Sequence, residues 1–273
     1  MLGRGAGRVL AGGTDLIPQL REGRRSTSHI VDLKHIPELT AIERQADGGW
    51  RIGAAATIGQ LAQDQLFAAE HRALLASAQL IGSLQIQNRA SLAGNVCNAA
   101  PSADAVPLLV CLGAEAEIAS ARGHRRILVA EVATAPGRTS LADNEILVAL
   151  HLPPRPARSA AAYLRFTPRR EMDIAIAGAG VSIVLDAGGR IADARIALAS
   201  VAPTTLAAEN AQRLLVGHRP SPVLLAEAAA AAAQEARPIS DTRGSAGYRR
   251  DLVAVLTRRA LETCVAELES QSA

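Results

Sequence analysis

The stretch NRASLAGNVCNAAPSAD, residues 88–104, carries more information about the fold than any other part of the sequence. Small residues surround Gly94 and polar residues alternate with them, so the backbone here can approach a ligand closely. A second loop of small residues, Ala11-Gly12-Gly13-Thr14-Asp15, lies far upstream. We expect the two loops to hold one phosphate-bearing cofactor together.

The residues around the upstream loop predict a strand followed by a helix. Residues 9–11 are expected to form a short buried strand that ends at Gly12-Gly13, after which Thr14 or Asp15 caps a helical turn. Backbone N–H groups converge at such a helix start and attract phosphate. Taken alone, a glycine pair between a strand and a helix is usually only a turn.

The end of the longer stretch predicts another helix start. Ser102 or Asp104 is expected to cap a helix over residues 105–111, which ends before Gly113. A carboxylate at a helix N-terminus is often only a cap. Asp104 becomes a candidate site residue because of the loop beside it.

Composition and charge exclude several classes of protein. The 29 basic and 26 acidic residues leave a net charge of +3, without a long basic run, and aromatic residues make up 2% of the chain. A nucleic-acid surface would need more positive charge and a stacking platform. Nucleic acid is therefore not an expected partner.

The cysteines and the apolar runs exclude further classes. Cys97, Cys111 and Cys264 are too few and too scattered for a structural zinc site or an iron–sulfur cluster, so we expect three small buried hydrophobic residues. The sequence shows no signal peptide, and no apolar run approaches the roughly 20 residues that span a bilayer. These observations predict a cytoplasmic protein without a membrane span.

Hydrophobic periodicity predicts alternating strands and helices in the first half and a small sheet with helices in the second. The expected elements of the second half are antiparallel strands over residues 161–166, 174–185 and 191–198, followed by helices over 207–216, 223–236 and 246–268. The Gly178-Ala179-Gly180 run falls within a strand, so it is not the start of a dinucleotide fingerprint. The arginine pair at 249–250 is expected to be solvated.

The sequence offers no catalytic machinery of its own. It lacks the G-x-x-x-x-G-K-[ST] phosphate loop, and its histidines show no metal-ligand spacing. A Ser-His-Asp arrangement cannot be assembled from it. We therefore expect a bound cofactor to perform the chemistry, and we name no catalytic residue and no metal ligand.

The two loops resemble the A-G-G-T-D and [TS]-[IL]-G-G-N motifs of the flavin-binding subunits of molybdenum hydroxylases, the carbon monoxide dehydrogenase and xanthine dehydrogenase family. The resemblance continues in collinear order through nearly the whole chain. It includes residues 81–89, 98–104, 169–175 and 195–204, and it ends at the closing segment 239–249.

The resemblance implies an α+β protein in two domains. The first, residues 1–154, would be an FAD-binding domain of the vanillyl-alcohol-oxidase-like (PCMH) type, and the second, residues 159–270, a smaller α+β domain with a three-stranded antiparallel sheet. Relatives carry an extra strand and helix before the first loop, so the N-terminal layer is expected to be truncated. Ala93 also stands where relatives have the first glycine of G-G-N, which would be costly if that position needs a positive φ.

The resemblance also implies a set of cofactor-binding residues. Two loops would wrap the pyrophosphate of FAD, Asp104 would lie near the ribityl and ring side of the flavin, and Asp173-Ile174 would approach the isoalloxazine. The residues implied are Ala11, Gly12, Gly13, Thr14, Asp15, Ser91, Leu92, Ala93, Gly94, Asn95, Asp104, Asp173 and Ile174.

In the family, the flavin takes electrons from an iron–sulfur small subunit that drains a molybdopterin large subunit. Electrons then leave to NAD, a quinone or another acceptor. The resemblance therefore implies an electron-transfer subunit in a dimer of heterotrimers, with molybdopterin and [2Fe-2S] clusters in the partner subunits. Two alternatives stay open: a stand-alone flavin oxidoreductase of the same superfamily, and a flavin-free assembly module.

Overall fold

The computed structural model describes residues 7–169 and 172–271. The chain forms two compact units. The first contains the residues up to Ala100 together with Gly113–Pro154, and the second contains Pro101–Leu112 together with the residues from Arg155 onward. Residues 101–112, which begin a few positions after the loop of residues 91–95, thus belong to the second unit.

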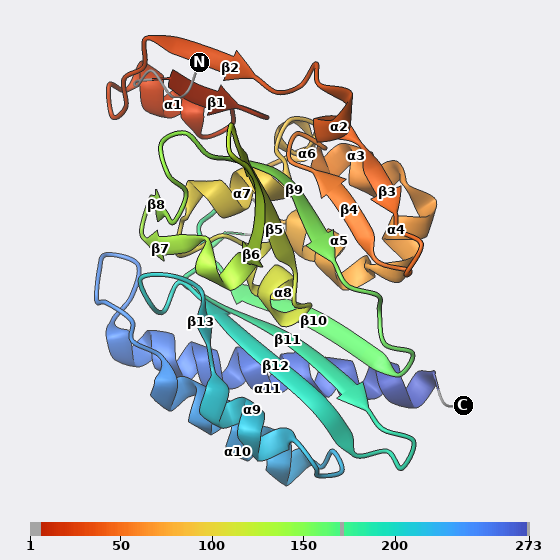
Figure 1. The fold of residues 1–273 in the computed structure, drawn as a ribbon. Helices are drawn as coiled ribbons and strands as arrows, with labels where there is room; N and C mark the ends of the chain where they lie inside the picture. The colour runs from red at the N-terminus through yellow and green to blue at the C-terminus, as the bar shows by residue number, and fades with distance from the viewer. Residues whose placement is uncertain (1–6, 170–171, 272–273) are drawn as a thin grey trace. The chain divides into compact units, whose positions relative to one another are not determined.

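A five-stranded sheet forms the centre of the first unit, with the strand order β3-β4-β9-β5-β6 and every neighbour antiparallel (Figure 1). Two smaller two-stranded sheets, β1-β2 and β7-β8, complete its β structure. The strands are β1 (Gly7–Leu10), β2 (His29–Asp32), β3 (Ile42–Arg44), β4 (Trp50–Gly53), β5 (Glu115–Ser120), β6 (Gly123–Leu128), β7 (Ala133–Ala135), β8 (Arg138–Thr139) and β9 (Ile146–Leu152).

Short helices connect and cover these strands. They are α1 (Leu16–Arg21), α2 (Pro37–Thr40), α3 (Ile58–Gln63), α4 (Gln65–Glu70), α5 (Arg72–Ala78), α6 (Leu84–Gln87) and α7 (Leu92–Asn98), with a 3-10 turn at Val129–Glu131. The helix α1 connects β1 to β2, which pair in parallel. The buried Phe67 packs edge-on against Trp50, with 5.2 Å between the ring centroids, and so joins α4 to the central sheet.

The second unit is built on a four-stranded antiparallel sheet with the order β10-β11-β12-β13. Its strands are β10 (Ser159–Phe166), β11 (Ala177–Leu185), β12 (Ile191–Ala199) and β13 (Leu206–Ala207). The first three strands were expected from the sequence, and β13 adds a short fourth one at the edge. Alternate residues of β11, from Ala177 to Ile183, enter one apolar core.

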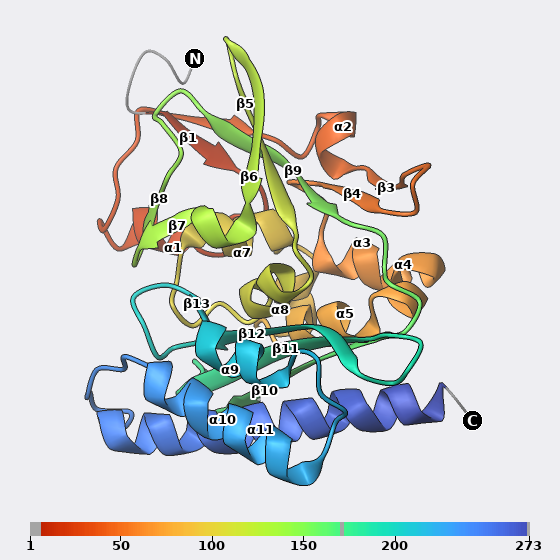
Figure 2. The same cartoon turned by 60° about the horizontal axis from the view of Figure 1, so that its bottom comes forward.

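Helices cover both faces of this sheet. Figure 2 shows α9 (Glu209–Leu215), α10 (Pro222–Glu235) and α11 (Ala246–Ser270) on one face and α8 (Val106–Cys111) on the other. The helix α8 packs directly on β11 at Gly180, where an added Cβ would lie 2.9 Å from Pro107 Cβ. Tyr163 similarly covers Gly178, where an added Cβ would lie 2.5 Å from its Oη. The Gly178-Ala179-Gly180 run is therefore a packing feature of a central strand.

Candidate functional site

The upstream loop, residues 11–15, which we call the first glycine loop, connects β1 to α1. Gly13 has φ of +78°, a left-handed conformation that an L-residue rarely adopts. Asp15, one of the two residues expected to cap this helix, occupies the N-cap position of α1, but its side chain makes no capping hydrogen bond. Its Oδ1 instead accepts a hydrogen bond of 3.1 Å from Asn98 Nδ2.

The downstream loop, residues 91–95, which we call the second glycine loop, forms the start of the helix α7. Ser91 is the N-cap, and its Oγ accepts a hydrogen bond of 3.0 Å from Gly94 N–H. Ala93 lies in the first turn of α7 and is buried, so this position has a helical backbone and needs no positive φ. The expected conformational cost of Ala93 in place of glycine does not arise in this structure. Cys97, expected to be buried, is exposed on α7, whereas Cys111 and Cys264 are buried.

The structure brings the two loops together within the first unit. Gly12 packs against the backbone of Arg89 so closely that an added Cβ would lie 2.0 Å from Arg89 O. The Arg89 guanidinium donates from Nε and Nη2 to Gly12 O, at 3.3 Å each. Asn98, at the end of α7, contacts Asp15 and also accepts a hydrogen bond of 3.4 Å from Gln19 Nε2. The two loops therefore lie against each other, although about 80 residues separate them in the sequence.

The joined loops leave a set of polar groups without partners. Among the described residues, six backbone N–H groups of the loops have no hydrogen-bond acceptor, those of Gly12, Gly13, Thr14, Asp15, Leu92 and Ala93. The buried Asn95 Oδ1 also lacks a partner. At Gly94 an added Cβ would meet only Ser91 Oγ, at 3.1 Å, beyond its own helix and chain neighbours. The unpaired N–H groups and the missing Cβ of Gly94 fit the pyrophosphate of a dinucleotide cofactor, because clustered N–H donors and an open backbone suit phosphate oxygens. Asn95 Oδ1 is an acceptor and would need a donor instead.

Asp104 is placed in the second unit and does not cap a helix. The helix α8 has Ala105 at its N-cap and no side-chain capping bond, which corrects the expectation for Ser102 and Asp104. The Asp104 carboxylate instead accepts hydrogen bonds from Tyr163 Oη at 2.9 Å and from Arg165 Nη1 at 2.5 Å. These two side chains extend from β10, two residues apart, and therefore lie on one face of the strand.

The cluster of Asp104, Tyr163 and Arg165 is buried. Asp104 is 7% exposed and the Arg165 side chain 6% exposed. Burial raises the pKa of Asp104 to about 6, although the positive charge of Arg165 and the hydrogen bond from Tyr163 act in the opposite direction. Burial and the neighbouring carboxylate raise the pKa of Tyr163 well above its usual value. Within this cluster both side-chain oxygens of Asp104 have donors.

Asp173 and Ile174 lie in the segment before β11, also in the second unit. The Ile174 side chain is exposed, whereas Asp173 accepts hydrogen bonds from Ile174 N–H at 2.8 Å and from Arg169 N–H at 3.1 Å. Desolvation raises the pKa of Asp173, but these hydrogen bonds outweigh it and leave the pKa below its usual value. The neighbouring Arg170 and Glu171 of the resemblance lie outside the described residues.

Arg249 is buried, which corrects the expectation that this arginine pair is solvated. Its side chain is 4% exposed, and Nη1 donates to Ile176 O at 2.7 Å and to Ser200 O at 3.1 Å. Its Nη2 pairs with Asp241 Oδ1 at 2.7 Å. Arg250, the other member of the pair, is exposed. Arg249 thus joins the closing segment of the sequence to the start of β11 and the end of β12.

Sequence reasoning missed the partners of these residues. Tyr163 and Arg165 escaped notice because nothing in the local pattern links them to Asp104, 59 and 61 positions away. Their i, i+2 spacing in a strand of small residues is the one available signal. Lys34, whose Nζ donates to Ala11 O at 3.2 Å, was also missed.

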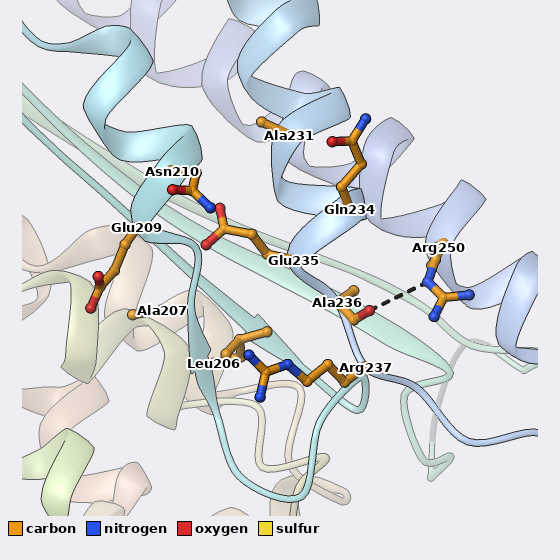
Figure 3. A pocket seen from close by; sticks show the side chains of 10 residues that line it. All are labelled: Leu206, Ala207, Glu209, Asn210, Ala231, Gln234, Glu235, Ala236, Arg237 and Arg250. Atoms are coloured by element: carbon orange, nitrogen blue, oxygen red, sulfur yellow. Dashed lines mark hydrogen bonds between the residues drawn. The ribbon is translucent and has the colours of Figure 1, made fainter.

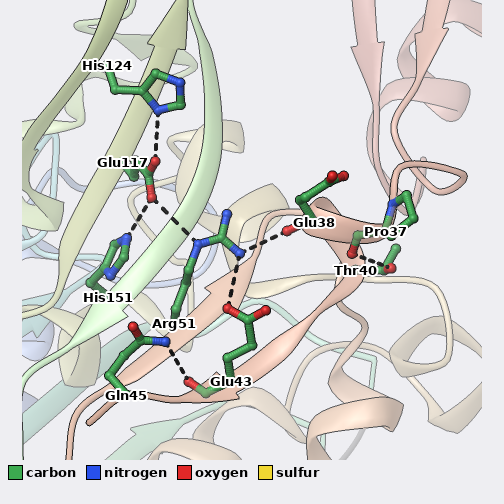
Figure 4. Close-up of polar contacts among 9 residues, drawn as sticks. All are labelled: Pro37, Glu38, Thr40, Glu43, Gln45, Arg51, Glu117, His124 and His151. Atoms are coloured by element: carbon green, nitrogen blue, oxygen red, sulfur yellow. Dashed lines mark hydrogen bonds and ion pairs between the residues drawn. The ribbon is translucent and has the colours of Figure 1, made fainter. Parts of the chain in front are cut away.

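A second polar cluster lies on the central sheet of the first unit (Figure 4). Glu117 accepts hydrogen bonds from His151 Nε2 at 2.7 Å and His124 Nδ1 at 2.8 Å, and it lies 3.7 Å from Arg51 Nε. Desolvation raises the pKa of Glu117, but the two histidine hydrogen bonds outweigh it and lower the pKa. In the part of the chain that the structure describes, no group of three or more His, Cys, Asp or Glu side chains is placed to hold a metal ion. We interpret this cluster as cross-strand pairing.

A hollow of about 650 Å³ lies elsewhere, in the second unit, between α9, the end of α10 and α11 (Figure 3). Two of its polar side chains are used in packing: Arg250 Nε donates to Ala236 O at 3.3 Å, and Glu235 accepts from Ala211 N–H at 3.1 Å. It contains none of the expected site residues. Within the described residues, no helix is long and apolar enough to cross a membrane.

Comparison with known proteins gives the same family as the motifs. Residues 4–155 match the family model described as the FAD binding domain in molybdopterin dehydrogenase, and residues 162–264 match the CO dehydrogenase flavoprotein C-terminal domain. The chain is 34% identical over 260 residues to the xanthine dehydrogenase FAD-binding subunit of Escherichia coli O157:H7, covering 95% of this chain and 89% of the relative. It is also 34% identical over 263 residues to the carbon monoxide dehydrogenase medium chain of Afipia carboxidovorans, covering 96% and 90%.

A solved structure agrees in fold. Carbon monoxide dehydrogenase from Hydrogenophaga pseudoflava matches with a TM-score of 0.92 and 29% identity, over 97% of this chain and 92% of that one. The resemblance stated from the motifs is thereby confirmed. The chain belongs to the FAD-binding medium subunits of the xanthine dehydrogenase and carbon monoxide dehydrogenase family of oxidoreductases.

Proposed function

We propose that this chain is the electron-transfer subunit of a multisubunit molybdenum hydroxylase and that residues 11–15 and 91–95 bind the pyrophosphate of FAD. The observation that carries the assignment is the pairing of two glycine loops whose N–H groups lack acceptors, in a chain of this family. These N–H groups stabilise phosphate charge by hydrogen bonding. When bound, FAD would supply the redox chemistry for electron transfer from iron–sulfur clusters of a partner subunit to an acceptor such as NAD or a quinone.

The second unit contributes the flavin-lining residues of this proposal. The exposed Ile174 side chain is available to pack against the isoalloxazine, and Asp173 fixes the backbone beside it through its hydrogen bonds. Asp104 lines the flavin as a member of the buried cluster with Tyr163 and Arg165. The domains of the proposal are residues 1–154 for FAD binding and 159–270 for the C-terminal domain, a division supported by the two family-model matches.

The proposed partners are an iron–sulfur small subunit and a molybdopterin large subunit, assembled as a dimer of heterotrimers. The support is the name of the Afipia carboxidovorans relative, a medium chain of carbon monoxide dehydrogenase. The substrate of such a complex would be selected by the molybdopterin subunit.

The purified chain tests the cofactor assignment. We expect a yellow protein with flavin absorption that releases FAD on denaturation. A colourless protein that cannot be reconstituted with FAD would contradict the assignment, and stable binding of an iron–sulfur subunit by that protein would favour the assembly module.

Anaerobic reduction of the flavin tests the electron-transfer role. The bound flavin should be bleached by the substrate of the complex only when the iron–sulfur and molybdopterin subunits are present. Bleaching by a soluble substrate in the chain alone would instead favour a stand-alone flavin oxidoreductase.

A further inference from the structure

We propose that Lys34 and Arg89 are positioning residues of the first glycine loop, where each holds one carbonyl oxygen so that the following N–H group faces the cofactor. This inference rests on the proposed function, because it concerns the pyrophosphate site of FAD. It assigns a role to two cations that do not belong to either glycine loop.

The two cations bind consecutive carbonyl groups. Lys34 Nζ donates to Ala11 O at 3.2 Å, and the Arg89 guanidinium donates through Nε and Nη2 to Gly12 O, at 3.3 Å each. Lys34 follows the end of β2, and Arg89 precedes the N-cap of α7. The loop is therefore held from two separate elements of the first unit.

Because the peptide group is planar, a bond that fixes a carbonyl oxygen also fixes the direction of the N–H group of the next residue. In a trans peptide the C=O and the following N–H point in opposite directions within one plane, and the described residues contain no cis peptide bond. The bond from Lys34 to Ala11 O therefore directs Gly12 N–H away from the ammonium. The bond from Arg89 to Gly12 O directs Gly13 N–H away from the guanidinium in the same way. Both N–H groups are among those without an acceptor.

The charge of Lys34 is already balanced. Its Nζ lies 2.7 Å from Asp32 Oδ1, and the same oxygen accepts a hydrogen bond of 3.0 Å from Lys34 N–H. These bonds from Lys34 lower the pKa of Asp32, which keeps its carboxylate ionised. An ammonium paired in this way anchors the loop to the end of β2, and the phosphate charge is left to the backbone N–H groups.

The sequence makes Lys34 unusual, because it is the only lysine among the 29 basic residues. An ammonium is a compact donor with three N–H groups, so it can serve the Asp32 carboxylate and the Ala11 carbonyl together. A guanidinium is a planar fork, which suits the paired donation of Arg89 to one oxygen. We therefore expect Lys34→Arg to rescue the Lys34 function only in part.

The test measures the dissociation constants of FAD and of ADP for the full chain by fluorescence and calorimetric titration. Lys34→Met and Arg89→Met should each weaken both ligands by about tenfold, the effect of one lost or misdirected hydrogen bond. ADP shares the adenosine and the pyrophosphate with FAD and lacks the ribityl chain and the flavin ring. Parallel losses for the two ligands therefore locate the effect in the ADP half of FAD, which contains the pyrophosphate. Arg125→Met is the matched control: it removes a two-bond fork to Glu145, at 2.8 Å each, that does not contact the loops. Its affinities should equal those of the wild type.

Further measurements separate positioning from direct contact with phosphate. In both variants without ligand, the amide NMR signals of residues 12–15 should shift and broaden relative to the wild type, because the loop becomes more mobile, while the salt dependence of FAD binding should stay the same. A smaller salt slope in Lys34→Met would assign the ammonium to the phosphate and overturn the positioning role. Asp32→Asn keeps the Lys34 ammonium but weakens the ion pair that holds it, so FAD binding should weaken less than in Lys34→Met. Unchanged or tighter FAD binding in Asp32→Asn would also overturn the positioning role.

The failure of this inference differs from the failure of the proposed function. A wild-type chain that binds no FAD contradicts the proposed function. A wild-type chain that binds FAD, together with Lys34→Met and Arg89→Met variants that bind it within twofold of the wild type, overturns the positioning role alone.

Discussion

The glycine loops of the first unit and the Asp104 cluster of the second unit differ in whether their polar groups have hydrogen-bond partners. In the loops, backbone N–H groups and Asn95 Oδ1 are left without partners. In the cluster, the Asp104 carboxylate has Tyr163 and Arg165 as donors, and both charges are buried. Sequence motifs had grouped the two regions as one set of cofactor-binding residues.

The difference separates ligand binding from internal stability. Unpaired polar groups that a fold keeps in place are costly unless a ligand or water satisfies them, so the loops are the region expected to respond to FAD. A buried charge with its partner stabilises its own unit only while both members are present. Substitutions that block or misdirect the unpaired N–H groups of the loops should therefore change FAD affinity, and substitutions of the buried charged residues of the second unit, such as Asp104 and Arg249, should mainly change the free energy of unfolding.

Among the substitutions expected to change stability, Arg249→Met should lower the free energy of unfolding most. Arg249→Met removes the donor of Ile176 O, Ser200 O and Asp241, and it should lower the free energy of unfolding by about 3–5 kcal/mol. Urea denaturation measures this loss. The neighbouring Arg250→Met, at an exposed residue with one bond of 3.3 Å to Ala236 O, should cost less than about 1 kcal/mol. Equal losses in the two variants would show that burial does not distinguish them.

Among the substitutions expected to change FAD affinity, Gly94→Val should have the largest effect. Its side chain would occupy the open space beside the unpaired N–H groups of α7, so FAD binding should fall by at least about 100-fold, or roughly 3 kcal/mol. Titration with FAD gives the affinity, and denaturation should show a much smaller change. Gly94→Ala, whose Cβ would meet only Ser91 Oγ at 3.1 Å beyond its own helix and chain neighbours, should lie between the wild type and the valine variant. Equal FAD affinity in the wild type and Gly94→Val would remove this loop from the site.

The pH dependence of stability should identify Asp104. Its pKa is raised to about 6 in the folded chain, above roughly 3.9 in the unfolded chain, so the folded state binds the proton more tightly. The resulting stability is fully present below about pH 4 and is lost as pH rises through 6, by at most about 3 kcal/mol. Unfolding measured from pH 4 to 7.5 should show this decline in the wild type.

The Asp104→Asn variant is the control for that decline. It should be flatter over the same pH range because the titrating group is gone, and its FAD affinity should change far less than that of Gly94→Val. The same decline in both proteins would place the titration at another residue.

Ala93→Gly should have the smallest effect of these substitutions, and it separates the stability of α7 from the affinity for FAD. Ala93 has a helical backbone and is 4% exposed, so glycine should cost about 1 kcal/mol of stability through helix propensity. FAD affinity should be preserved or slightly tighter, because the substitution removes a Cβ that lies next to the unpaired N–H groups of α7. Weaker FAD binding in this variant would mean that the rigidity of α7 matters more than the missing Cβ.

The sequence by itself determined the features that depend on neighbouring residues. Ser91 caps α7 and Thr57 caps α3, and the apolar alternation from residue 174 onward produces β11, because caps and strand faces are set within a few positions of the chain. The collinear motifs also gave the family, which the comparisons confirm.

Tertiary structure alone decided which polar groups find partners. Asp104 looked like a helix cap but is bound by Tyr163 and Arg165, and Arg249 looked solvated but bonds Ile176 O, 73 positions away. The contact of Arg89 with Gly12 O spans 77 positions. A local pattern shows that a charge is present but cannot show what will lie beside it, because burial and pairing depend on elements that meet only when the chain folds.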